Sequence, residues 1–178
     1  LIVGEIAIGL AIGFFLKLLF AAVELAGDAI GLQMGLSFAA FVDPQNQVPA
    51  PIVGSFLTSV LILVFLATNG HLTLLGALAD SFGRWPVGSP PEWSDAATVV
   101  AHGSFLFEIG LRIALPVLGV LLMVNLALGV LARTAPQLNL FAVGFPLTLI
   151  GGLAALALSR PTLVSTMERA LAASLARL

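Results

Sequence analysis

The chain has 178 residues, of which 60% are hydrophobic and only 9% are charged, with a formal net charge of −2. Soluble domains carry about 25% charged residues, and a chain of this length cannot hide so much apolar surface in its own core. The charge excludes a basic field for nucleic acid, the lack of cysteine excludes disulfides and cysteine-ligated zinc, and the apolar content excludes disorder.

Four long apolar blocks follow one another along the chain, and no strand-like alternation persists over a useful length. The second, third and fourth blocks are each long enough to cross a bilayer as a helix, which takes ~20 apolar residues. We therefore predict an all-α, membrane-associated bundle of long, kinked helices that forms a single domain over residues 1–178. Because the chain opens inside an apolar run, we expect an N-terminal part of the full-length protein to precede it. The blocks are Leu1–Leu25, Ile52–Asp80, Ile113–Ala132 and Leu140–Ser159.

A glycine repeat closes the first block. Gly27, Gly31 and Gly35 recur every four residues, and Gly9 and Gly13 have the same spacing. In a helix such glycines form one smooth face that lets another backbone approach closely. Each glycine also weakens a helix by ~1 kcal/mol relative to alanine. The repeat therefore predicts either ordinary helix packing or a segment that unwinds readily.

The second interpretation is a mobile apolar plug between Gly31 and Asn46. Met34 favours it, because an unbranched thioether adapts its shape to what it touches. Phe38 lies four residues further on and would share the face of Met34 in a helix. Such a segment can close a conduit without any covalent chemistry.

The second block contains a break at Asn69-Gly70-His71. Asn-Gly pairs favour turns, so this block is predicted to be one bent helix or a tight helical pair. Its two arms are Ile52–Thr68 and Leu72–Asp80. The loops that flank the block are rich in proline, which forbids a helix interior there.

The third block carries Glu108 and Arg112, four residues apart in the favourable order for a helical ion pair. An unpaired charge at membrane depth costs ~3 kcal/mol or more, so we expect a buried ion pair, with a proton relay as the sharper alternative. Pro116 should kink the helix.

In the fourth block we expect the helix to end near Arg160. After Pro161 the sequence predicts a short amphipathic helix whose apolar stripe is Leu163, Met167, Leu171, Leu175 and Leu178.

The motifs of enzymes and cofactor sites are missing. His71 and His102 are the only histidines, and they are far apart without ligand-like neighbours. No serine has the context of a nucleophile elbow, and no glycine loop has the pattern of a phosphate cradle. We therefore expect no catalytic residues, no cofactor and no metal.

Three stretches together resemble the FliR/SctT family of type III secretion export-gate proteins. They read GLQMGLSFAAFVDP from Gly31, FLATNGHL from Phe65 and ARTAPQLNLFAVGFPLTL from Ala132. The Asn-Gly-His bend and the Gln-Met-Gly pattern favour the flagellar branch of this family over the injectisome branch. The order and spacing fit along nearly the whole chain, except at the start, where the earlier helices of the family are lacking.

The resemblance implies a subunit that assembles with FliP and FliQ into a helical export gate, joined by FlhB, in the flagellar basal body of the bacterial inner (cell) membrane. Such a gate passes unfolded flagellar proteins, and its subunits form helical hairpins that lie partly above the bilayer. It also implies that the segment from Gly31 is the plug. On this hypothesis Gly31 and Gly35 let the plug move aside, and the sealing residues are Gln33, Met34, Leu36, Phe38 and Phe41.

Two alternatives stay open. The first is a small-solute membrane transporter whose polar site is Glu108 and Arg112. The second is a purely structural scaffold, in which case removing the glycine–methionine segment would disturb assembly and leave sealing intact.

Overall fold

A computed structural model of the chain describes residues 2–36, 51–84, 86, 96–135 and 140–175, and these contain helices and no strand. The all-α prediction is therefore confirmed for the described part of the chain. The helices are α1 (Ile2–Gln33), α3 (Ile52–Ala67), α4 (Gly70–Arg84), α5 (Ala96–Thr134) and α6 (Leu140–Leu175).

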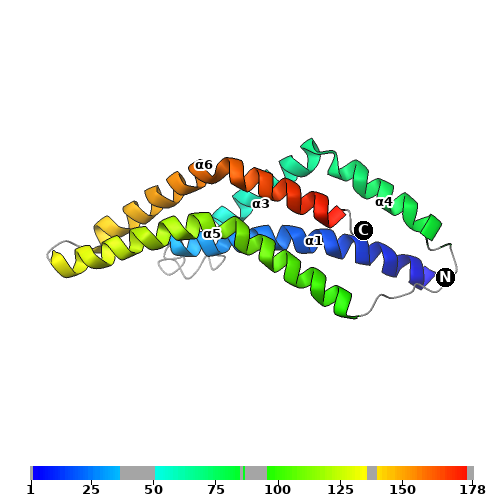
Figure 1. Cartoon of the computed structure of the whole chain (residues 1–178), viewed down its shortest axis with the longest axis horizontal. Coiled ribbons are helices and arrows are strands. Elements are labelled where there is room, and N and C mark those ends of the chain that lie inside the picture. Colours follow the sequence, from blue (N-terminus) through cyan, green and yellow to red (C-terminus); the bar gives the residue numbers. More distant parts are fainter. Residues whose placement is uncertain (1, 37–50, 85, 87–95, 136–139, 176–178) are drawn as a thin grey trace, which may run out of the picture.

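The helices form an elongated bundle (Figure 1). α5 and α6 run side by side as a long antiparallel hairpin, and α1 packs mainly on α3 and α5. α4 leaves the bundle after α3 and runs toward the end of the molecule where α1 begins. The molecule exposes 11312 Å² of surface. A compact monomer of this mass exposes only about 8,200 Å², so the bundle leaves far more surface open than a self-sufficient domain does.

The core is a narrow seam along the bundle axis. α1, α3, α5 and α6 contribute side chains at spacings of three and four residues, which is the periodicity of one helix face. The largest fully buried side chains are Leu19, Val23, Ile30 and Met34 of α1, Leu57 and Leu61 of α3, Ile113, Val117 and Leu121 of α5, and Met167 and Leu171 of α6.

α6 corrects one prediction. We expected a separate short helix after Pro161, but α6 continues through both Pro146 and Pro161. A proline removes one hydrogen bond and bends a helix without ending it when packing holds both halves, and both halves of α6 contribute to the core. The predicted stripe is confirmed at its first three members, which are buried; Leu178 lies outside the described residues. α5 likewise stays helical through Pro116, and Figure 1 shows it bent rather than straight.

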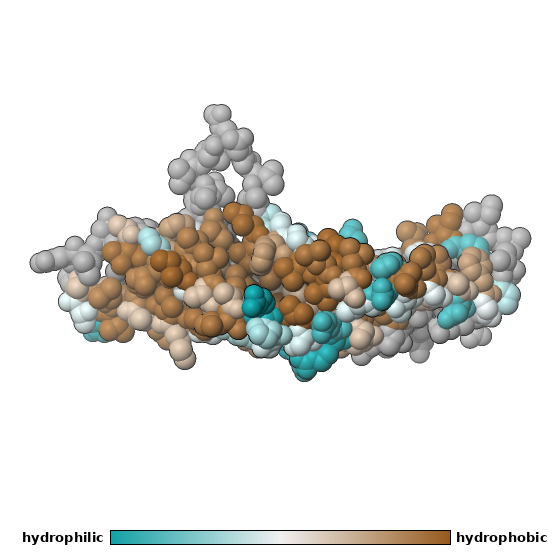
Figure 2. Space-filling model, turned by 90° about the horizontal axis from the view of Figure 1, so that it is seen from above, coloured by the Kyte–Doolittle hydropathy of each residue, from teal (hydrophilic) through white to brown (hydrophobic). Residues whose placement is uncertain are grey.

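Three helices are long and apolar enough to cross a membrane: Gly4–Gln33, Phe107–Thr134 and Ala142–Leu175. α3 and α4 together pass the same test as a pair bent by 68°. Figure 2 shows apolar residues spread over most of the visible described surface, with hydrophilic residues gathered in a few patches. Together these observations are those of a membrane-embedded protein.

Candidate functional site

The end of α1 is a glycine-dependent cap. The amide of Leu36 donates to the carbonyl of Gly31 over 3.1 Å, and the amide of Gly35 donates to the carbonyl of Leu32 over 3.0 Å. This is the bond pair of the Schellman motif, whose left-handed residue is usually glycine. Gly35 has a φ of 81°. The sequence prediction that Gly35 lies on the same helical face as Gly27 and Gly31 was therefore wrong, because Gly35 ends the helix.

Met34 sits immediately before this cap and is buried to 1% exposure. Its side chain lies against Gly152 of α6 so closely that an added Cβ at Gly152 would be 2.5 Å from the Met34 Cγ and 2.7 Å from the Sδ. The buried hydroxyl of Thr148, one helical turn earlier on α6, donates a hydrogen bond to the Met34 carbonyl over 3.1 Å. We call Thr148 and Gly152 the Met34 seat. It joins the end of α1 to the N-terminal half of α6.

Upstream of Met34, α1 is held by backbone contacts at small residues. A Cβ at Gly27 would lie 2.5 Å from the Cα of Gly54 and 2.6 Å from its nitrogen, so α1 and α3 cross backbone to backbone there. On α5, a Cβ at Gly110 would lie 2.8 Å from the carbonyl oxygen of Ala22. The predicted close approach is confirmed at Gly27. At Gly31 an added Cβ would make only ordinary contact with Val53.

The break between α3 and α4 is the predicted helical bend. Asn69 has a φ of 56°, a left-handed conformation that asparagine tolerates better than most residues. Its carbonyl accepts the amides of Leu72 and Thr73 at the start of α4. A Cβ at Gly70 would overlap the ring of Phe65, and that ring also packs edge-on against His71. The bend is thus fixed by the backbone and by aromatic packing.

The predicted sealing residues fall into two groups. Met34 is buried, and Leu36, half-buried, packs against the core. Gln33 is half-buried at the last residue of α1. Phe38 and Phe41 lie outside the described residues, as does the rest of the segment up to Asn46. The structure therefore places the base of the predicted plug on α6, and the sealing role of its residues stays a prediction.

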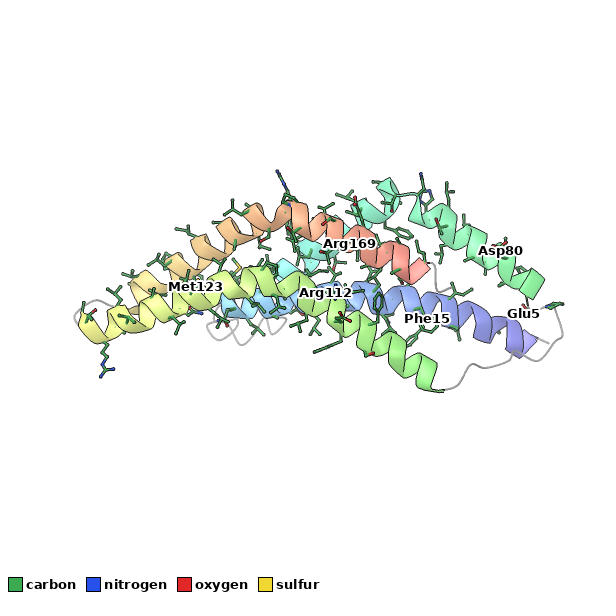
Figure 3. The ribbon with its side chains drawn as sticks, viewed as in Figure 1. Glu5, Phe15, Asp80, Arg112, Met123 and Arg169 are labelled. Carbon is green, nitrogen blue, oxygen red and sulfur yellow. The ribbon has the colours of Figure 1, made fainter. Side chains whose placement is uncertain are left out.

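Glu108 and Arg112 form the predicted ion pair, with 2.6 Å between Oε1 and Nη2. The Arg112 and Glu108 side chains are, however, 67% and 54% exposed on α5, so this chain does not bury the pair. Figure 3 shows Arg112 near the middle of α5, with Glu5 and Asp80 toward one end of the molecule. The transporter alternative needs a buried polar site, and within the described chain this pair does not supply one.

Sequence reasoning missed Thr148 and Gly152. The Gly151-Gly152 pair inside an apolar helix was an available indication, because glycine there favours a close helix contact. No local pattern indicated the hydrogen bond of Thr148, since its partner is 114 residues away in the sequence. Among the described residues, no group of three or more acidic, histidine or cysteine side chains is arranged to hold a metal.

The chain is similar to known bacterial export proteins over most of its length. The sequence model of the family described as bacterial export proteins, family 1, matches residues 1–174. The flagellar biosynthetic protein FliR of Escherichia coli (strain K12) is 46% identical over 169 residues, which cover 94% of this chain and 65% of that protein. FliR of Pectobacterium carotovorum is 46% identical over 162 residues, 90% of this chain and 62% of that protein. FliR of Bacillus subtilis (strain 168) is 37% identical over 147 residues, 80% and 57% respectively. The chain spans less than two thirds of the length of these relatives.

Proposed function

This chain belongs to the family of bacterial export proteins, family 1, and we propose that it forms part of the flagellar type III protein export gate. On this proposal its 178 residues are a single helical gate domain. It contributes to the inner-membrane channel for unfolded flagellar proteins and does no covalent chemistry. The observation that carries the proposal is the family match over residues 1–174, supported by relatives named flagellar biosynthetic protein FliR.

The proposed partners are FliP and FliQ in the gate and FlhB beside it. The exposed apolar surface supports a chain that needs neighbours, because large side chains such as Met123 (74% exposed) and Leu126 (71%) on α5 point outward. The hairpin stretches 113–132 of α5 and 140–159 of α6 contain no Asp, Glu, Lys or Arg. Lipid or other apolar subunits would cover such a surface at no desolvation cost.

The proposed plug is the segment that begins at the cap of α1. Gly31 and Gly35 set its base, and the sealing residues are Gln33, Met34, Leu36, Phe38 and Phe41. Apolar constrictions stop ions by dewetting. Glycine at the turn and the small contact with α6 support a segment that can move relative to α1, while the backbone contact at Gly27 supports a fixed helix upstream.

The structure changes how the plug should be tested. A deletion from Leu32 to Phe41 would remove Met34 and the Gly35 cap, and would damage the core as well as any seal. The sharper variant is Phe38→Ser with Phe41→Ser in the full-length protein, assembled with its partners in bacterial membranes. The control is Phe82→Ser, which alters an exposed phenylalanine of α4.

The expected result is a higher ion conductance of membranes that carry the doubly substituted gate, with FliP and FliQ still co-purifying. The control variant should leave conductance unchanged. Intact complexes that leak no more than the wild type would exclude the plug and leave a structural scaffold as the remaining interpretation.

A further inference from the structure

We propose that the Met34 seat is a releasable latch, which holds the end of α1 on α6 in the closed gate and lets go when the gate opens. The proposal rests on the proposed gate function, and it adds the two residues of α6 that control it, Thr148 and Gly152. Neither residue belongs to the plug segment predicted from the sequence.

The contact is small and separate from the contacts that fix α1. Upstream, α1 meets α3 at Gly27 and α5 at Ala22 through backbone atoms. At Met34 the contact with α6 includes one flexible thioether side chain against Gly152 and one hydrogen bond from Thr148, and no backbone crossing is formed there. A thioether with three rotatable bonds can leave such a surface without any backbone clash.

The hydrogen-bond partners of Thr148 favour reversibility. The Thr148 hydroxyl lies 3.1 Å from the Met34 carbonyl and 3.0 Å from the carbonyl of Phe145 in its own helix. A hydroxyl has one hydrogen to donate. When Met34 leaves, the hydroxyl can donate to Phe145 instead, so release strands no buried donor on α6. A buried donor without an acceptor is the usual obstacle to breaking a buried polar contact.

Gly152 sets the depth of the seat. With an added Cβ lying 2.5–2.9 Å from three atoms of the Met34 side chain, any larger residue at position 152 would push that side chain out. The neighbouring Gly151 is different, because a Cβ there would meet Val124 of α5 at 3.2 Å. The two glycines therefore serve different partners, α1 and α5.

The test is a reversible cross-link in the full-length protein within the assembled gate. The chain contains no cysteine, so Met34→Cys with Gly152→Cys introduces a single pair here, with any cysteine outside these residues replaced by serine. The added Cβ at position 152 lies 2.5 Å from the Met34 Cγ. The Met34 Cβ is one bond further, so the two Cβ atoms lie at most about 4 Å apart, a separation that a disulfide can bridge. Inside-out membrane vesicles are treated with copper phenanthroline or with dithiothreitol. Export of a flagellar subunit and ion conductance are both measured, with Met34→Cys alone as the control, because Gly152→Cys alone would displace the Met34 side chain.

We expect the cross-link to form in the resting gate, to lower export at least tenfold without raising conductance, and to be reversed by dithiothreitol. Failure of the pair to cross-link, or unchanged export by the cross-linked gate, would overturn the latch. If the latch fails while Phe38→Ser with Phe41→Ser still raises conductance, the proposed gate function stands. If that double variant has no effect either, the plug is excluded together with the latch, and a structural scaffold is the remaining interpretation.

A second variant avoids cysteine. Thr148→Val keeps the shape but leaves the buried Met34 carbonyl without its donor in the latched state, which should raise the population of released Met34 by roughly 2- to 10-fold. Conductance of the resting gate should rise accordingly, while Thr162→Val, at an exposed position of the same helix, should not change it. Equal conductance of the two variants would contradict the latch.

Discussion

The crossing of α1 and α3 at Gly27 gives the sharpest stability prediction. In Gly27→Ala the new Cβ would lie 2.5 Å from the Gly54 Cα and 2.8 Å from the Val53 carbonyl carbon. Carbon atoms in contact prefer ~3.5–4.0 Å, so the helices must separate by roughly 1 Å. Backbone atoms cannot rotate away, and overpacking of this kind costs about 1–3 kcal/mol. The better helix propensity of alanine offsets ~1 kcal/mol of that loss.

Gly13→Ala is the matched control, because nothing lies within 4 Å of a Cβ at Gly13 on the same helix. It keeps the propensity gain and has no clash. Gly54→Ala should fall between the two variants, since its nearest neighbour is the movable carboxylate of Asp28, with the Glu24 carbonyl oxygen at 3.0 Å. Because both variants share the propensity gain, the free energies of unfolding of Gly27→Ala and Gly13→Ala should differ by the overpacking cost alone, about 1–3 kcal/mol.

The assay is thermal unfolding of the full-length protein in detergent, followed by far-ultraviolet circular dichroism. For a protein of this size each kcal/mol shifts the midpoint by about 2–4 °C, so the two variants should melt roughly 2–12 °C apart. Equal midpoints would refute the backbone crossing. If Gly54→Ala melted at a lower temperature than Gly27→Ala, the closest backbone contact would not be at Gly27.

Three further predictions use the same assay. Gly35→Ala should lower the midpoint by roughly 2–4 °C, because a left-handed alanine costs about 1 kcal/mol; no change would mean that the cap is not formed. Gly70→Ala should be destabilised by about 1–2 kcal/mol, since its Cβ overlaps the Phe65 ring beside the Phe65 carbonyl; wild-type stability would contradict the fixed bend. Glu108→Gln should change stability by no more than about 0.5 kcal/mol, because its ion pair with Arg112 is exposed. A larger loss in the assembled gate than in the single protein would mean that a neighbour buries the pair.

The sequence predicted the features of this fold that depend on local patterns. Each of the four apolar blocks lies in a long helix or in the bent pair, because apolar length alone requires helical backbone when the surroundings offer no water. The bend was readable since Asn69 and Gly70 are residues that favour a turn. The close contact at Gly27 was readable because small residues permit backbone approach.

Other features depended on tertiary contacts that no local pattern encodes. The repeat of Gly27, Gly31 and Gly35 looked uniform, yet one glycine crosses α3, one touches a side chain and one ends the helix. Pro161 was expected to separate two helices, but packing of the residues that follow it kept α6 continuous. The place of Met34 depended on Gly152, and only the folded chain brings these residues together.

The two kinds of contact along α1 have different mechanical consequences. A backbone crossing such as that at Gly27 is tightly packed, and small displacements there lose contacts on both helices at once. The contact of Met34 is carried by one flexible side chain and one hydrogen bond that has a second acceptor nearby. Any force on the end of α1 should therefore break the second contact before it disturbs the first. Motion would then be confined to the residues after Gly31, with the rest of α1 held against α3 and α5, and the gate could open without unfolding the bundle that supports it.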